Sequence, residues 1–293
     1  SSSSAASDVY KRQPEDGIDT GNGIKMMHGR PMKDWNWYKG GYGYLTVTQI
    51  LEVSSNIGTS SIIEKYYGSN PQKFVDGLKR MSIDQPLQLQ IAGEGKPNIK
   101  GPKERYFAKT TLPWMSIGYE TQVPPMNILT FYNAIANNGV MVRPKFVKAA
   151  IKNGEIVKEY PTEIINPKIC SERTLKQIQE ILYKVVHEGL AAPAGSKQFA
   201  VSGKTGTAQE NKKRPNHALF ISYAPYDNPD ITMTVVVPNG YTSANAAEIA
   251  RDIYKYYFGK ASKAEKKATT ALLPTGSDLS LIHISEPTRL RCI

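Results

Sequence analysis

The chain has 293 residues, of which 40% are hydrophobic and 22% are charged, so it can bury the core of one large domain. Its formal net charge of +11 comes largely from scattered lysines, which favours a lysine-rich exterior over a nucleic-acid-binding surface. With two cysteines and histidines that lack ligand spacing, the composition excludes a disulfide framework and a metal cluster, and no cofactor is expected.

Both ends of the chain resemble translated sequencing-library adapters. Residues 3–13 read SSAASDVYKRQ, and residues 279–289 read LSLIHISEPTR. Neither stretch has a coherent apolar period, so we treat residues 1–13 and 279–293 as non-native segments. The remainder predicts one folded domain at 14–260, followed by a flexible Lys/Ala/Thr-rich tail at 261–278.

The first half of the folded domain is predicted to be mainly helical. Residues 14–44 are rich in Gly and aromatic residues and predict irregular or short-strand structure. A helix from Thr46 places Ser54 one turn further along its apolar face, and Gly58 is interpreted as a break. Further helices are predicted over 60–67, 71–81 and 125–137, with a loop over 82–113.

The second half predicts an antiparallel meander and a closing helix. Asn153-Gly154 indicates a hairpin, and Ser171 caps a long helix that ends at Gly189. Strands are predicted over 199–209, 218–224 and 231–238. A final helix over 243–258 turns Ala246, Ile249, Ala250, Ile253 and Tyr257 inward. Helices followed by a meander indicate an α+β fold.

Lys204-Thr205-Gly206, within the run Val201–Gln209, is the first candidate for a functional motif. A positive charge and hydroxyls on a strand edge suit a substrate that carries a carboxylate. Gly206 leaves room for that substrate to approach the backbone. Alone, the tripeptide is weak evidence, because it is expected by chance in roughly one chain of this length in fifteen.

Ser54-Ser55-Asn56 is the second candidate. A hydroxyl and an amide two positions apart at a helix end can face one cleft, where the serine relays a proton and the amide holds a substrate peptide group. In isolation the same residues are typical of a simple helix stop.

Together the two motifs resemble those of penicillin-binding transpeptidases and serine β-lactamases, which combine Ser-x-x-Lys, Ser-x-Asn and Lys-Thr-Gly. The runs SSNIG at 54–58, SIGY at 116–119 and KTGTAQ at 204–209 are similar to class B penicillin-binding proteins of septal or elongation cell-wall synthesis. The resemblance covers nearly all of 14–260. Glu120 departs from it, because the family often has a small residue there.

The resemblance implies a role for each matched residue. Ser54 would relay a proton toward the leaving D-alanine, Asn56 would hold the stem-peptide amide, and Lys204 would keep Ser54 reactive. Thr205 and Thr207 would bind the terminal carboxylate, with Gly206 between them. The implied ligands are peptidoglycan stem peptides and β-lactam antibiotics, and the implied partner is a glycan-polymerising membrane protein. The parent would be anchored in the cell membrane with its catalytic domain outside the cytoplasm.

The third motif is absent from the chain. No serine is followed by lysine three positions later. The family's nucleophile lies a few tens of residues before Ser-x-Asn, so we interpret the chain as a fragment without the N-terminal part of the domain. We expect it to be inactive alone; a pseudoenzyme is the other interpretation.

Other classes of protein would differ from a transpeptidase in measurable properties. A serine β-lactamase or β-lactam sensor would share the fold and the motifs, and a lactamase would release a chromogenic cephalosporin quickly. A basic nucleic-acid-binding module would show salt-dependent DNA binding. A phosphate-binding loop is excluded, because Gln198 stands where that motif needs glycine.

Overall fold

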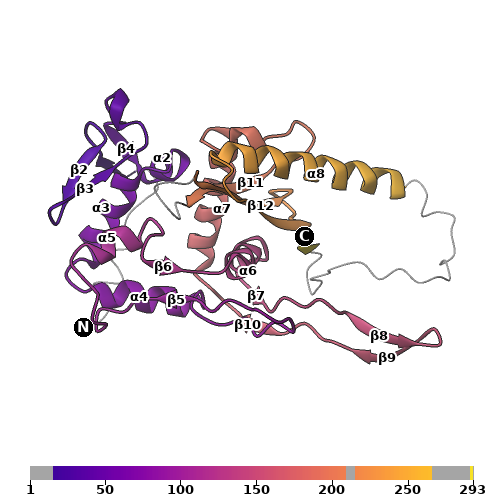
Figure 1. Cartoon of the computed structure of the whole chain (residues 1–293). Helices are drawn as coiled ribbons and strands as arrows, with labels where there is room; N and C mark the ends of the chain where they lie inside the picture. Colours follow the sequence, from indigo (N-terminus) through magenta and orange to yellow (C-terminus); the bar gives the residue numbers. More distant parts are fainter. Residues whose placement is uncertain (1–15, 209–214, 266–290, 293) are drawn as a thin grey trace.

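An antiparallel sheet forms the centre of the fold in a computed structural model that describes residues 16–208, 215–265 and 291–292 (Figure 1). Strands β11 (Ser202–Ala208), β12 (His217–Ala224) and β13 (Ile231–Val237) pair in sequence order. The short strand β14 (Arg291–Cys292) lies parallel to β13. The three predicted strands are therefore confirmed, with residue 209 outside the described part.

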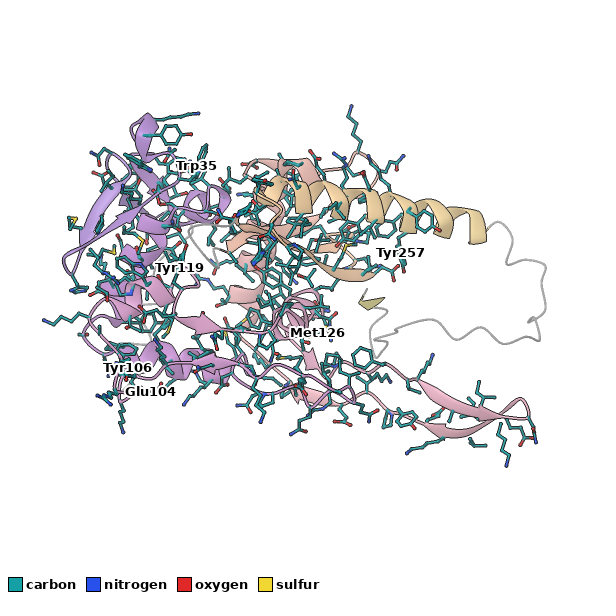
Figure 2. The ribbon with its side chains drawn as sticks, in the orientation of Figure 1. Trp35, Glu104, Tyr106, Tyr119, Met126 and Tyr257 are labelled. Atoms are coloured by element: carbon teal, nitrogen blue, oxygen red, sulfur yellow. The ribbon has the colours of Figure 1, made fainter. Side chains whose placement is uncertain are left out.

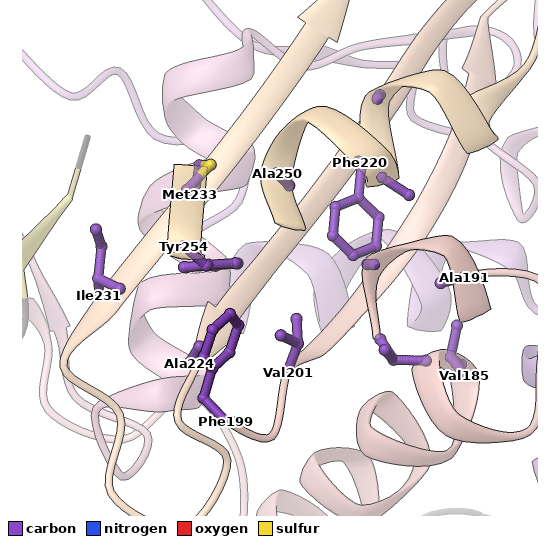
Figure 3. Close-up of a cluster of buried hydrophobic side chains, with 14 of the residues drawn as sticks. Val185, Ala191, Phe199, Val201, Phe220, Ala224, Ile231, Met233, Ala250 and Tyr254 are labelled. Carbon is purple, nitrogen blue, oxygen red and sulfur yellow. The ribbon is translucent and has the colours of Figure 1, made fainter. Parts of the chain in front are cut away.

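Helices cover both faces of the sheet, because alternate side chains of its strands are apolar on opposite sides. The largest buried cluster joins α8 (Ser243–Glu265) to the face that carries Phe220, and it includes residues of α7 (Glu172–His187) (Figure 3). Its labelled members are Val185, Ala191, Phe199, Val201, Phe220, Ala224, Ile231, Met233, Ala250 and Tyr254. On the other face, Ile221 packs with Leu129 of α6 (Pro125–Ala136).

Two short helices meet at a tight turn next to the sheet. α2 (Val47–Glu52) begins with a capping box between Thr46 and Gln49, and α3 (Asn56–Tyr67) begins after Ser55. The predictions that Ser54 extends the helical stripe and that Gly58 breaks the helix are wrong. Gly58 lies inside α3, where an added Cβ would be 2.5 Å from Ile50 Cγ1. A glycine at position 58 therefore allows α3 to pack closely on α2, and it does not form a turn.

The remaining elements are short and surround this frame. The prediction of short strands over 14–44 is confirmed by two antiparallel pairs, β1 with β4 and β2 with β3. The elements are β1 (Gly17–Asp19), β2 (Ile24–Met27), β3 (Arg30–Lys33), η1 (Trp37–Lys39), β4 (Tyr44–Thr46), α4 (Pro71–Arg80), β5 (Asn98–Ile99), α5 (Thr111–Met115), β6 (Thr121–Gln122), β7 (Met141–Val142), β10 (Ile164–Asn166) and η2 (Ala192–Ala194).

The predicted hairpin at Asn153-Gly154 is confirmed by β8 (Ala149–Lys152) and β9 (Glu155–Glu159), which project away from the body (Figure 1). Both turn residues have left-handed φ values of 53° and 83°, as a two-residue hairpin loop requires.

The two long helices differ in detail from their predictions. Ser171 Oγ caps α7 as expected, by accepting a hydrogen bond from Thr174 N at 3.2 Å. Gly189 allows a close approach, because a Cβ there would lie 2.6 Å from the Glu52 carbonyl oxygen. On α8 the expected inward position of Ile249 is wrong: Ile249 is 43% exposed, whereas Tyr254 is fully buried. Tyr254 lies inward because it shares one helix face with Ala246 and Ala250 at intervals of four residues, and its hydroxyl hydrogen-bonds Ser222 Oγ at 2.9 Å.

α8 continues through Glu265, five residues beyond the predicted domain boundary. Within the described residues, no helix is both long enough and apolar enough to cross a bilayer.

Candidate functional site

A cleft of about 850 Å³ lies where the α2–α3 turn meets the edge strand β11 and the loop between β13 and α8. All six residues predicted to form the site line this cleft. They come from two segments 150 residues apart, so only the tertiary fold brings them together. The lining residues are Trp35, Leu51, Ser54, Ser55, Asn56, Thr59, Ser116, Ile117, Tyr119, Leu190, Lys204, Thr205, Gly206, Thr207, Asn216, Tyr241, Thr242, Ser243 and Ala244.

Lys204 connects the two segments. Its Nζ donates hydrogen bonds to Ser54 Oγ and, at 3.2 Å, to the Thr205 carbonyl oxygen. Burial lowers the pKa of Lys204 from 10.5 to about 8, because the charged ammonium loses hydration. Lys204 therefore holds Ser54 while binding its own proton less tightly than an exposed lysine does.

Ser54 lies in the turn between α2 and α3 with a φ of 50°, in the left-handed region. Non-glycine residues are uncommon there and remain only where the surrounding structure holds them. Backbone hydrogen bonds fix the turn from the α2 side, with Ser54 N donating to Leu51 O at 3.3 Å and Ser55 N to Ile50 O at 2.9 Å. The turn directs Ser54 toward β11 instead of continuing the helix.

Asn56 is the first residue of α3, and its Nδ2 donates to the Lys33 carbonyl oxygen at 2.8 Å. The neighbouring Asp34 also reaches this turn, because its carboxylate accepts from Ser55 Oγ at 2.8 Å and from Ile57 N at 3.0 Å. Sequence reasoning missed Asp34. No motif spacing signals it, since it contacts residues 21 and 23 positions away.

Thr205, Gly206 and Thr207 form the β11 wall of the cleft. Thr205 is 9% exposed, and Thr207 is exposed. A Cβ on Gly206 would have Leu219 Cβ as its nearest neighbour, at an ordinary 3.4 Å. Internal packing therefore does not require glycine at 206, which is compatible with the prediction that a ligand approaches there.

The loop after β13 forms a further wall that sequence reasoning missed. Tyr241 has a φ of 63° and is 74% exposed at the cleft. Tyr241 N donates to Asn216 O at 3.1 Å, and Asn239 N donates to His217 Nδ1 at 3.0 Å. These bonds attach the loop to the start of β12.

Trp35 and Tyr119 come from the N-terminal side of the cleft (Figure 2). Their side chains are 52% and 45% exposed. Glu120, which departs from the family pattern, has a φ of 57° and accepts hydrogen bonds from Thr111 Oγ1 at 3.0 Å and Lys100 Nζ at 3.4 Å. The Thr111 contact holds the loop that carries Tyr119 against α5, and the Lys100 contact joins it to the segment after β5.

Metal binding has no support in the described part of the chain, where no group of three His, Cys, Asp or Glu side chains could hold an ion. The arrangement instead offers a hydroxyl, a buried amine, an amide and two further hydroxyls around one cleft. Those groups can transfer a proton and bind a carboxylate.

Comparison with known proteins identifies a family whose model matches most of this chain. A family model described as the penicillin binding protein transpeptidase domain matches residues 3–255. The match begins inside residues 1–13, which the sequence predicts to be adapter-derived and which lie outside the described residues.

Curated relatives are similar over most of the chain. Peptidoglycan D,D-transpeptidase MrdA of Haemophilus influenzae is 27% identical over 256 residues, which cover 77% of this chain and 38% of that protein. Penicillin-binding protein 2B of Streptococcus pneumoniae is 28% identical over 253 residues, which cover 76% of this chain and 37% of that protein. The chain thus spans less than two fifths of the length of these relatives.

Solved structures confirm the α+β fold shared by penicillin-binding proteins and serine β-lactamases. The D,D-transpeptidase domain of a peptidoglycan glycosyltransferase from Eggerthella lenta has a TM-score of 0.73 and 19% identity, covering 87% of this chain and 63% of that one. The structure of penicillin-binding protein A from M. tuberculosis in an imipenem acyl-enzyme complex has a TM-score of 0.70 and 18% identity. The match covers 87% of this chain and 57% of that one.

Proposed function

Because the chain belongs to the family of penicillin-binding protein transpeptidase domains, we propose that it is part of a class B D,D-transpeptidase that cross-links peptidoglycan stem peptides. The observation that carries this proposal is the contact of Lys204 with Ser54 in a cleft that Asn56, Thr205 and Thr207 also line. The names of the relatives from H. influenzae and S. pneumoniae support it.

In the proposed reaction, a serine in a Ser-x-x-Lys motif attacks the carbonyl carbon of the penultimate D-alanine, with the motif lysine as base. The terminal D-alanine leaves as a free amine, and an acyl-enzyme remains. The amine of a second stem peptide then attacks the acyl carbonyl, forms the cross-link and frees the serine. A β-lactam would acylate the same serine; penicillin-binding protein A from M. tuberculosis forms such an acyl-enzyme with imipenem.

The described residues would serve this reaction around the missing nucleophile. Ser54 would pass a proton to the departing amine, and Lys204, which donates a hydrogen bond to Ser54 Oγ, would keep Ser54 reactive through its charge. Asn56 would hold the stem-peptide amide. The hydroxyls of Thr205 and Thr207 would bind the terminal carboxylate, and the Thr207 N–H would supply half of the oxyanion hole.

The parent protein is proposed to be anchored in the cell membrane, with this domain on the extracytoplasmic side and a glycan-polymerising membrane protein as partner. These proposals rest on family membership. The domain boundaries at 13, 260 and 278 also remain predictions.

Labelling with a fluorescent penicillin tests the function. We expect no covalent adduct on the present chain, because no serine has lysine three positions later. The same chain extended upstream to include a Ser-x-x-Lys should be labelled, and a serine-to-alanine change in that motif should abolish the signal. An adduct on the present chain would refute its proposed inactivity, and an unlabelled extended chain would refute the transpeptidase proposal.

A further inference from the structure

Asp34 is a buried carboxylate directed at the start of α3. Its side chain follows β3 and is 1% exposed. Oδ2 accepts from Ser55 Oγ at 2.8 Å, and Oδ1 accepts from Ile57 N at 3.0 Å. Ser55 Oγ in turn accepts from Gly58 N at 2.9 Å. The carboxylate therefore binds the first turn of the helix both directly and through its N-cap.

The preceding residue holds the same turn by its backbone. The Lys33 carbonyl oxygen accepts from Asn56 Nδ2 at 2.8 Å. Two consecutive residues thus bind Ser55, Asn56 and Ile57 by three hydrogen bonds. Ser54 is the residue immediately before this anchored run.

Ser54 needs such anchoring, because its φ of 50° is sparsely populated for serine. Strained backbone of this kind persists only where neighbouring contacts over-determine it. Bonds from α2 hold Ser54 on one side, and the Asp34 contacts hold the chain on the other. Without Asp34, the turn could relax toward a right-handed conformation and carry the Ser54 hydroxyl away from Lys204.

We infer that Asp34 is a positioning residue for the proton relay: it fixes Ser55 and Ile57 so that the intervening turn presents Ser54 to Lys204 and Asn56 to the cleft. This inference rests on the proposed function for its catalytic meaning. The geometric part can be measured in the chain without any reaction.

The proton affinity of Lys204 provides the measurement. The chain is prepared with ¹³C-labelled lysine, the Lys204 signal is assigned from the variant Lys204→Arg, and its pH titration is followed by NMR. Burial lowers the wild-type pKa to about 8. In Asp34→Asn, one of the donors at the turn loses its acceptor, so Ser54 should move away from Lys204 and water should enter the cleft. The midpoint of the Lys204 pH titration should then rise by at least about one pH unit.

A matched variant separates positioning from stability. Ser171→Ala removes the N-cap of α7, whose Oγ accepts from Thr174 N at 3.2 Å, outside the residues that line the cleft. It should lower the melting temperature without changing the Lys204 midpoint. A folded Asp34→Asn variant with a lowered melting temperature but an unchanged Lys204 midpoint would overturn the inference and leave Asp34 as a stability residue only.

If Asp34→Asn does not fold, Asp34→Glu serves instead, because the longer side chain displaces the carboxylate from Ser55 Oγ and Ile57 N while the Ser55 bond to Gly58 N stays in place. A raised Lys204 midpoint in that variant supports positioning, and an unchanged one overturns it. The proposed function fails separately, through an unlabelled extended chain in the penicillin assay.

Discussion

The Lys204 ammonium on β11 donates a hydrogen bond to the Ser54 hydroxyl, although 150 residues separate them in the chain. The contact is made in the cleft, where burial lowers the pKa of Lys204 from 10.5 to about 8. The folded protein therefore binds this proton less tightly than the unfolded chain does, which costs stability wherever Lys204 is charged.

Replacing Lys204 by methionine should remove that cost. Between pH 8 and 10.5 the unfolded chain holds the proton and the folded chain does not, so wild-type stability rises with pH across this interval. Relative to Lys204→Met, the wild type should gain up to roughly 3 kcal/mol between about pH 7 and pH 10.5. Urea unfolding at several pH values measures the difference. Lys176→Met, at an exposed position on α7, controls for loss of one positive charge; parallel curves for wild type and Lys204→Met would contradict the prediction.

Gly58→Ala should destabilise the α2–α3 unit. The new Cβ would lie 2.5 Å from Ile50 Cγ1, so the helices must separate, at a cost of about 1–3 kcal/mol. Gly77→Ala is the matched control in α4, where the nearest atom is Arg80 Nη2 at 3.7 Å. It should stabilise the protein by roughly 0.5–1 kcal/mol, because alanine favours a helix interior. Equal effects of the two changes on thermal unfolding would refute the packing argument.

Glu52→Gln should stabilise the protein more at pH 7 than at pH 4. Glu52 is 8% exposed on α2. Its burial, and to a smaller extent the negative charge of nearby Glu188, raises the pKa of its carboxyl above 4.5, although the positive charge of Lys184 acts in the opposite direction. The folded state thus holds this proton more tightly than the unfolded state, and stability falls as pH rises through the interval between the two pKa values. Denaturant unfolding at both pH values checks the sign. Glu248→Gln on α8, where the side chain is exposed, is the charge control, and a Glu52→Gln benefit confined to pH 4 would reverse the conclusion.

Thr207→Val should weaken non-covalent binding of benzylpenicillin to this chain by about tenfold or more, because a hydroxyl bond to a carboxylate contributes roughly 1.5–3 kcal/mol. Thr207 is exposed on β11 and lines the cleft. The penicillin methyl ester, which lacks the carboxylate, serves as the control ligand and should bind wild type and variant alike. NMR titration measures both. Equal losses for acid and ester would show that Thr207 does not recognise the carboxylate.

Local pattern predicted most of the elements correctly. The start of a helix at Thr46, the cap at Ser171, the Asn153-Gly154 hairpin and the meander all follow from residues that are close in the chain. The errors occurred where the packing of α2 against α3 and the turn between them decided the outcome. Gly58 looks like a helix breaker, but it allows α3 to pack on Ile50, and Ser54 leaves the helical stripe because its turn is held in a left-handed conformation.

By itself, the sequence determined the fold class and the residue types of the candidate site, because periodicity, capping and the two short motifs are local properties. The tertiary structure decided that Ser54 and Asn56 share one cleft with Lys204, Thr205, Gly206 and Thr207. It also revealed the contacts of Asp34 and Tyr241 that hold two walls of that cleft. The physical reason is that hydrogen bonds between distant segments, and the burial that lowers the pKa of Lys204, exist only after the chain has folded.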